Sequence, residues 1–102
     1  MEVNVIYSDK LSELIQNGEK IQIVDIREEY EIENEGKSNG LHIPMGDLVS
    51  RIDELNKTGK VVFHCSSGNR SMNILKFFVM NNLYKENYYS LDGGFKEWVK
   101  YI

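Results

Sequence analysis

Short apolar runs alternate along the chain with stretches in which apolar residues recur at helical spacing. Residues 21–26 and 61–63 are rich in β-branched side chains and apolar on both faces, as are strands inside a parallel sheet. Residues 3–7 alternate apolar and polar positions, which is typical of an edge strand, and residues 88–91 form the last predicted strand. Strands separated by helical segments predict an α/β fold.

Polar residues mark the ends of the predicted helices. A first helix is expected to begin at Ser8 or Asp9, whose side chains can cap it, and to end at about Asn17. The longest helix is predicted over residues 71–82, with Asn81 and Asn82 as its C-terminal cap. A final helix is expected after the Asp92-Gly-Gly94 turn.

The middle of the chain is less regular. Residues 35–40 are a loop by composition, and His42 beyond it is expected to be a strand residue with a solvated or hydrogen-bonded ring. After a turn at Pro44, apolar residues at positions 48, 52 and 55 recur at helical spacing and predict a helix there.

Length and composition limit the function classes. With 102 residues, 41% of them hydrophobic and 27% charged, the chain is expected to form one domain over residues 1–102. No apolar run approaches the roughly 18 residues of a membrane span, and the start of the chain lacks the basic residues of a signal peptide. We therefore expect a cytoplasmic protein with no membrane partner. The net charge of −4, without clustered basic residues, argues against nucleic acid as a partner.

Cysteine and histidine are scarce. One cysteine, Cys65, cannot form an internal disulfide, and with only His42 and His64 beside it there is no ligand set for structural zinc, so neither a metal nor a cofactor is expected. His64 directly precedes Cys65 in a predicted strand, so its side chain should point to the opposite face of the sheet. We expect a core histidine whose ring nitrogens have hydrogen-bond partners.

Cys65 stands where a predicted strand ends and a small, polar, glycine-containing loop begins. Loop N–H groups, the start of the next helix and Arg70 would together favour the charged form of the thiol. The sequence therefore indicates a reactive cysteine. The structural alternative is a small buried hydrophobic residue, the usual state of a free cysteine. Apolar residues are absent from the five positions after Cys65, which favours chemistry.

Three blocks of the chain resemble the rhodanese family of small α/β sulfurtransferases. The first is Ile23-Val-Asp-Ile-Arg-Glu-Glu-Tyr-Glu31, similar to an Asp-x-Arg-x-x-x-Glu segment of the family. The second places Cys65, Gly68, Arg70 and Ser71 in the family's loop pattern, and the third is Leu91-Asp-Gly-Gly-Phe-Lys-Glu-Trp98. Residues 35–40 depart from the family, because its Gly-His-Ile-Pro-Gly-Ala segment is missing there. The resemblance implies a three-layer α/β/α domain with a central, mostly parallel sheet of about five strands.

The resemblance also implies an activity, in which Cys65 takes a sulfane sulfur from a donor such as thiosulfate, carries it as a persulfide, and passes it to cyanide or a thiol. Arg70 would either bind an anionic donor or tie the loop to a carboxylate elsewhere, and the two roles are compatible. The substrate-binding loop would comprise Ser66, Ser67, Gly68, Asn69 and Ser71. Structural support for the site would come from Asp25, Arg27, Glu31, Gly93 and Gly94.

Two other functions stay open. A cysteine phosphatase or arsenate-reductase-like enzyme is disfavoured, since four residues separate Cys65 from Arg70 and cysteine phosphatases use one more. A non-catalytic interaction module that keeps only the fold is disfavoured by the presence of Cys65 and Arg70. The loop has little positive charge beyond Arg70, so a protein persulfide is a donor candidate besides a small anion.

Overall fold

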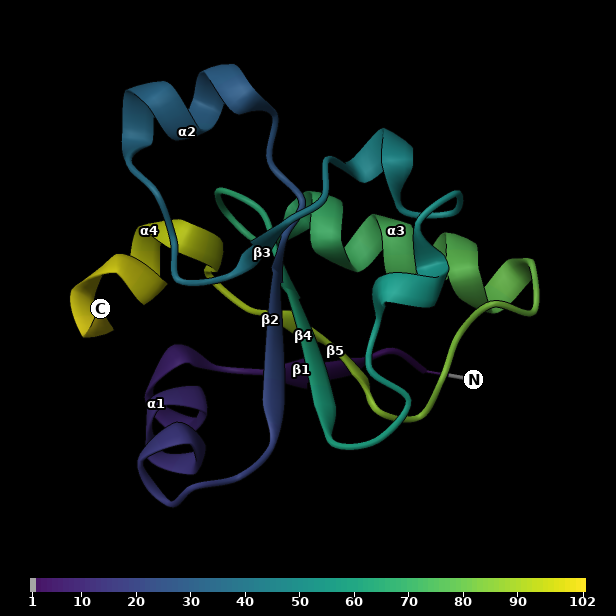
Figure 1. The fold of residues 1–102 in the computed structure, drawn as a ribbon, viewed down its shortest axis with the longest axis horizontal. Helices are drawn as coiled ribbons and strands as arrows, with labels where there is room; N and C mark the ends of the chain where they lie inside the picture. The colour runs from purple at the N-terminus through teal and green to yellow at the C-terminus, as the bar shows by residue number, and fades with distance from the viewer. Residues whose placement is uncertain (1) are drawn as a thin grey trace.

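Five parallel strands form one sheet at the centre of the computed structural model, which describes residues 2–102 (Figure 1). The strands are β1 (Asn4–Ile6), β2 (Ile21–Asp25), β3 (Leu41–His42), β4 (Lys60–His64) and β5 (Tyr88–Leu91). Their order across the sheet is β1-β5-β4-β2-β3, so the strand before Cys65 lies in the middle. The prediction of about five mostly parallel strands with an edge strand at the start of the chain is confirmed.

Helices cover both faces of this sheet. They are α1 (Ser8–Gln16), α2 (Glu29–Glu35), α3 (Asn69–Met80) and α4 (Gly94–Trp98). In Figure 1, α1 and α4 lie on one side of the sheet, α3 lies on the other, and α2 lies beyond the carboxyl ends of the strands. The expected three-layer α/β/α arrangement is therefore present.

The core is divided by the sheet into two clusters of buried residues. The larger cluster lies on the α3 side and includes Val24, Phe63, Leu75, Phe78 and Tyr88. The smaller lies under α1 and α4 and includes Ile6, Leu11, Leu14, Val62 and Trp98. Neighbouring residues of β4 thus contribute to opposite clusters, as strand geometry requires. This packing fixes the carboxyl end of β4, where Cys65 follows.

The helix predicted between positions 48 and 55 is wrong. Two 3-10 turns, Met45–Asp47 and Ile52–Glu54, occupy this part of the chain. Arg51, with φ −111° and ψ 20°, leaves the helical region between them. Leu48 and Leu55 are nevertheless buried, so the apolar spacing is satisfied by two short turns packed on the core.

Other helix boundaries also differ from expectation. Ser8 is the first residue of α1, Tyr7 precedes it as N-cap, and no side chain caps this end, so capping by Ser8 or Asp9 is wrong. Helix α3 begins at Asn69, two residues before the expected Ser71.

The ends of α1 and α3 agree with the sequence. Asn17 is the C-cap of α1 and Gly18 follows with φ +80°. Asn81 is the C-cap of α3 and Asn82 follows with φ +58°.

Helix α2 was not predicted. Its glutamates show no broad apolar stripe, and a capping box between Glu28 and Glu31 forms its start. Between residues 2 and 102, no helix has both the length and the apolar character needed to cross a membrane.

Candidate functional site

Cys65 lies at the carboxyl end of the central strand and faces the backbone of the loop that follows it. The residue is fully buried, and the Gly68 N–H donates to its Sγ over 3.1 Å. Gly68 has φ +103°, a conformation that L side chains rarely adopt, and it precedes the first residue of α3. The tight turn at Gly68 therefore folds the loop back so that its amides point at the sulfur.

Two opposing effects act on the Cys65 thiol. Burial raises its pKa, because a charge is poorly solvated there, while backbone N–H groups of Ser71, Gly68, Ser67 and Arg70 lower it. The net result is a pKa below the ordinary value. The thiol belongs to the apolar core cluster, as the structural alternative expected, but the amides around it favour negative charge. Such a group can act as a nucleophile.

A pair of buried hydroxyls lies behind the sulfur. Ser71 Oγ is 3.9 Å from Cys65 Sγ and donates to the Gly68 carbonyl over 3.1 Å. Ser90 Oγ, from β5, lies 2.7 Å from Ser71 Oγ. These contacts connect the loop to α3 and β5, so both elements help to hold the loop in its conformation. Ser90 was not predicted, since a single serine in a strand carries no distinguishing signal.

The Gly93-Gly94 pair packs directly on the loop. A Cβ at Gly94 would meet the carbonyls of Ser66 and Cys65 at 2.6 and 2.7 Å, and one at Gly68 would meet Gly93 N at 3.2 Å. The next two amides, of Phe95 and Lys96, donate to the Cys65 and Ser66 carbonyls over 2.8 and 3.1 Å. The first turn of α4 therefore binds both loop carbonyls and fixes this part of the loop.

Arg70 forms a two-point ion pair with Glu31 of α2. Its Nη1 and Nη2 lie 2.8 and 2.6 Å from Glu31 Oε2 and Oε1. Hydrogen bonding from Arg70 is the main cause that lowers the pKa of Glu31, and the same bond raises the pKa of Arg70. Glu31 is thus the carboxylate partner that the structural interpretation of Arg70 expected.

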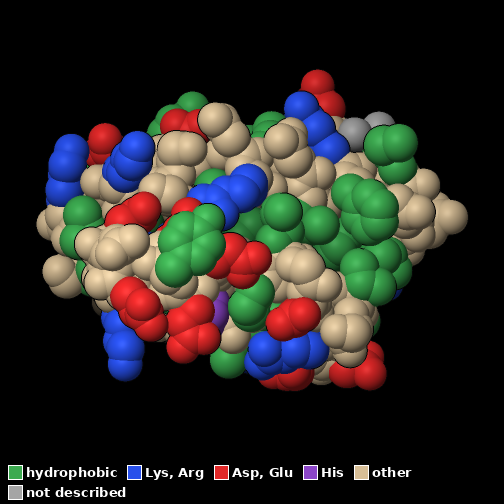
Figure 2. Space-filling model, turned by 90° about the horizontal axis from the view of Figure 1, so that it is seen from above, with side chains coloured by type: hydrophobic (Ala, Val, Ile, Leu, Met, Phe, Trp, Pro, Cys, Tyr) green, Lys and Arg blue, Asp and Glu red, His purple; other side chains and the backbone are tan. Residues whose placement is uncertain are grey.

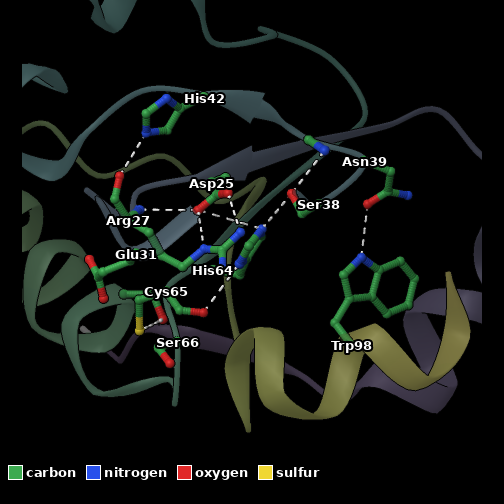
Figure 3. Close-up of polar contacts among 12 residues, drawn as sticks. Asp25, Arg27, Glu31, Ser38, Asn39, His42, His64, Cys65, Ser66 and Trp98 are labelled. Atoms are coloured by element: carbon green, nitrogen blue, oxygen red, sulfur yellow. Dashed lines mark hydrogen bonds and ion pairs between the residues drawn. The ribbon is translucent and has the colours of Figure 1, made fainter. Parts of the chain in front are cut away.

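A second ion pair lies beneath the loop, between Asp25 and Arg27. Arg27 is fully buried and donates to Asp25 over 3.0 and 2.8 Å (Figure 3). It also donates to the Gly36 carbonyl over 3.0 Å, and its guanidinium lies 4.0 Å from the centre of the Phe95 ring. Burial raises the pKa of Asp25, but Arg27 and His64 outweigh it and the net pKa is lowered. These contacts join Asp25 and Arg27 at the turn after β2. Their role in supporting the site stays a prediction.

Both histidines have the structural environments that we expected. His64 is fully buried; its Nδ1 faces the Cys65 carbonyl at 3.2 Å and its Nε2 faces Ser38 Oγ at 3.0 Å (Figure 3). Because a carbonyl only accepts, the neutral ring carries its proton on Nδ1 and Nε2 accepts from Ser38. Burial is the main cause that lowers the pKa of His64. His42 Nε2 lies 2.7 Å from the Arg27 carbonyl.

Sequence analysis did not identify Glu35, which contacts the loop. Glu35, the last residue of α2, accepts a hydrogen bond from Ser66 Oγ over 3.0 Å and lies 3.5 Å from Arg27 Nη1. Residues 28–35 contain several glutamates, and no pattern marks the one that contacts the loop. Ser67 and Asn69 are exposed at the edge of the loop.

Comparison with known proteins agrees with the geometry. The family model described as Rhodanese-like domain matches residues 8–101. The chain belongs to the rhodanese-like domain family. A Bacillus subtilis protein named "Putative sulfurtransferase YtwF" is 33% identical over 96% of this chain and 92% of its own length. A protein of Allochromatium vinosum named "Sulfurtransferase" is 30% identical over 97% of this chain and 91% of its own.

Solved structures of other rhodanese-like domains are similar. A rhodanese-related protein from Thermoplasma volcanium has a TM-score of 0.74 and 25% identity, with 95% of this chain and 91% of that chain covered. A rhodanese-like domain protein from Staphylococcus aureus has a TM-score of 0.78 over 94% and 91% of the two chains, at 24% identity. The fold of this chain is therefore that of known rhodanese-like domains.

Proposed function

We propose that this rhodanese-like domain is a sulfurtransferase in which Cys65 carries a persulfide. The observation that carries the proposal is the Gly68 N–H aimed at Cys65 Sγ over 3.1 Å, within a set of backbone amides that lowers the thiol pKa. Amides directed at a sulfur stabilise a negative charge on it, much as an oxyanion hole stabilises oxygen. The names of the relatives support the same chemistry.

The reaction has two steps. The Cys65 thiolate attacks the sulfane sulfur of a donor, the donor's own bond to that sulfur breaks, and the electron pair leaves with the donor remnant, which is sulfite when the donor is thiosulfate. A thiolate or cyanide then attacks the outer sulfur of the Cys65 persulfide, and the Cys65 thiolate leaves. Electrons and sulfur are conserved, so the cycle needs no external oxidant or cofactor.

No general base is needed when Cys65 is already a thiolate, a state that the lowered pKa favours, and this agrees with the hydrogen bonds of the two histidines. His64 is occupied by the Cys65 carbonyl and Ser38, and His42 by the Arg27 carbonyl. The cycle requires a free thiol, and a reducing compartment such as the cytoplasm would keep Cys65 in that state.

Intact mass spectrometry after incubation with thiosulfate, and separately with an organic persulfide, tests the proposal. We expect the mass of one added sulfur atom, removed by cyanide or excess thiol, and no gain in Cys65→Ser. A chain that gains no sulfur from either donor contradicts the proposal, and a gain that persists in Cys65→Ser places the acceptor elsewhere.

An aryl phosphate assay on the same sample tests the phosphatase alternative. Four residues separate Cys65 from Arg70, one fewer than in cysteine phosphatases. In addition, the Arg70 guanidinium is paired with Glu31, so it is not free to bind a phosphate. We expect no hydrolysis above that of Cys65→Ser. Hydrolysis that depends on Cys65 would favour the phosphatase alternative instead.

A further inference from the structure

The charge of Arg70 is already neutralised in this chain. Both terminal nitrogens of its guanidinium bind Glu31, whose carboxylate is mostly buried and also accepts from the Glu28 N–H over 2.8 Å. The carboxylate is therefore held in place from two sides. An anionic donor that approaches Cys65 would meet an ion pair with no net charge.

A second carboxylate adds negative charge beside the loop. Glu35 lies 3.0 Å from Ser66 Oγ, so the Ser66 hydroxyl points at a carboxylate and is not available to an anionic donor. Arg27, 3.5 Å from Glu35, is paired at shorter distance with Asp25. The side chain of Glu35 is 37% exposed, so its charge reaches the solvent in front of the loop.

The other glutamates in and next to α2 add to the negative charge of Glu35. Residues 28–35 contain five glutamates and neither lysine nor arginine. The face seen in Figure 2, which looks down on α2, carries a group of acidic side chains. A doubly charged donor such as thiosulfate would be repelled from this side, whereas positive charge around a sulfur would be attracted.

We propose that Glu31 and Glu35 determine which sulfur donor Cys65 accepts. They select against doubly charged inorganic anions and favour a persulfide on a protein whose cysteine is flanked by lysine or arginine side chains. This inference rests on the proposed sulfurtransferase function. In the step concerned, the Cys65 thiolate attacks the outer sulfur of R–S–SH, the donor S–S bond breaks, and R–S⁻ leaves while the proton stays on the transferred sulfur.

The test compares donors of opposite charge in single-turnover loading, followed by intact mass. The probes are thiosulfate and the persulfides of two short peptides of equal length, with the cysteine flanked by lysines in one and by glutamates in the other. For the wild-type chain we expect the lysine peptide to load at least about tenfold faster than the glutamate peptide, with a difference that shrinks as salt rises.

Two variants separate the role of Glu35 from overall charge. Glu35→Gln keeps an oxygen for Ser66 Oγ but removes the charge, and it should speed loading from thiosulfate by about five- to tenfold, the effect of one charge on a dianion through solvent. Loading from the lysine peptide should be slower, because the charge that attracts its lysines is lost. Glu86→Gln makes the same charge change at an exposed position before β5 and should alter none of the three rates.

The outcomes distinguish the inference from the function on which it rests. The proposed donor selection is wrong if the two peptides load Cys65 equally fast, or if Glu35→Gln leaves the rate with thiosulfate unchanged. Either result leaves the proposed sulfurtransferase function standing. If no donor loads Cys65 at all, both the function and the selection are wrong.

Discussion

The backbone of Gly94 lies against the Cys65 carbonyl so closely that a Cβ at position 94 would stand 2.7 Å from that oxygen. Real Cβ atoms do not approach backbone oxygen at this distance, and Gly94 also has φ +58°. The contact joins the last helix to the loop that holds the sulfur. The loop therefore depends on a residue 29 positions away along the printed sequence.

Gly94→Ala should destabilise the chain and slow sulfur loading. The added methyl forces the Cys65–Ser66 backbone to move and adds strain at a positive φ, so we expect a loss of about 2–4 kcal/mol in the free energy of unfolding, measured in urea. Gly18→Ala is the matched control, since it has φ +80° but nothing within 4 Å of a Cβ. It should cost about 1 kcal/mol and leave loading unchanged. Similar losses of stability and loading in both variants would contradict the role of the contact.

The pairing of Glu31 with Arg70 should be measurable as an energetic coupling. We expect a double-mutant cycle with Glu31→Gln and Arg70→Gln, followed by urea unfolding, to give about 1 kcal/mol, because the pair is two-pronged but Arg70 is partly exposed. The exposed pair Arg51–Glu54 has similar distances and should show a smaller coupling. Equal coupling in the two pairs would show that burial of Glu31 contributes nothing.

His64 should make stability depend on pH near neutrality. Burial lowers its pKa in the folded chain, so the unfolded chain, with an ordinary pKa of about 6.5, binds a proton first as pH falls. Above the unfolded pKa, the neutral ring makes its full contribution to the free energy of unfolding. This contribution is lost as pH falls below the unfolded pKa. Between pH 7 and 5.5 the wild type should lose up to about 1 kcal/mol more than His64→Gln, measured by urea unfolding. Identical pH profiles would contradict this account of His64.

Sequence patterns predicted the sheet and the loop because both depend on local chemistry. The β-branched, apolar run before Cys65 favours a buried strand, and the small residues after it allow a tight turn. The turn expected at Asp92-Gly-Gly94 is present before α4, and its backbone lies close to Ser66 and Cys65. Here the composition of a few adjacent residues restricted the backbone conformation.

Features that depend on distant partners could not be predicted in the same way. The resemblance expected Glu31 to anchor the loop, but its pairing with Arg70 across 39 positions appears only when α2 is folded above α3. Glu35 and Ser90 looked like ordinary surface and strand residues. The helix expected at Leu48 to Leu55 failed because buried apolar spacing can be met by two short turns as well as by one helix.

The titration of the Cys65 thiol most directly tests the claim that loop amides favour negative charge on this sulfur. Thiolate absorbance, or the rate of alkylation by a small neutral reagent, would be followed against pH in the folded chain and in the same chain unfolded in urea. The amides predict a folded pKa below the unfolded value of about 8.5. A folded pKa above the unfolded value would mean that burial prevails over the amides, and it would contradict the account.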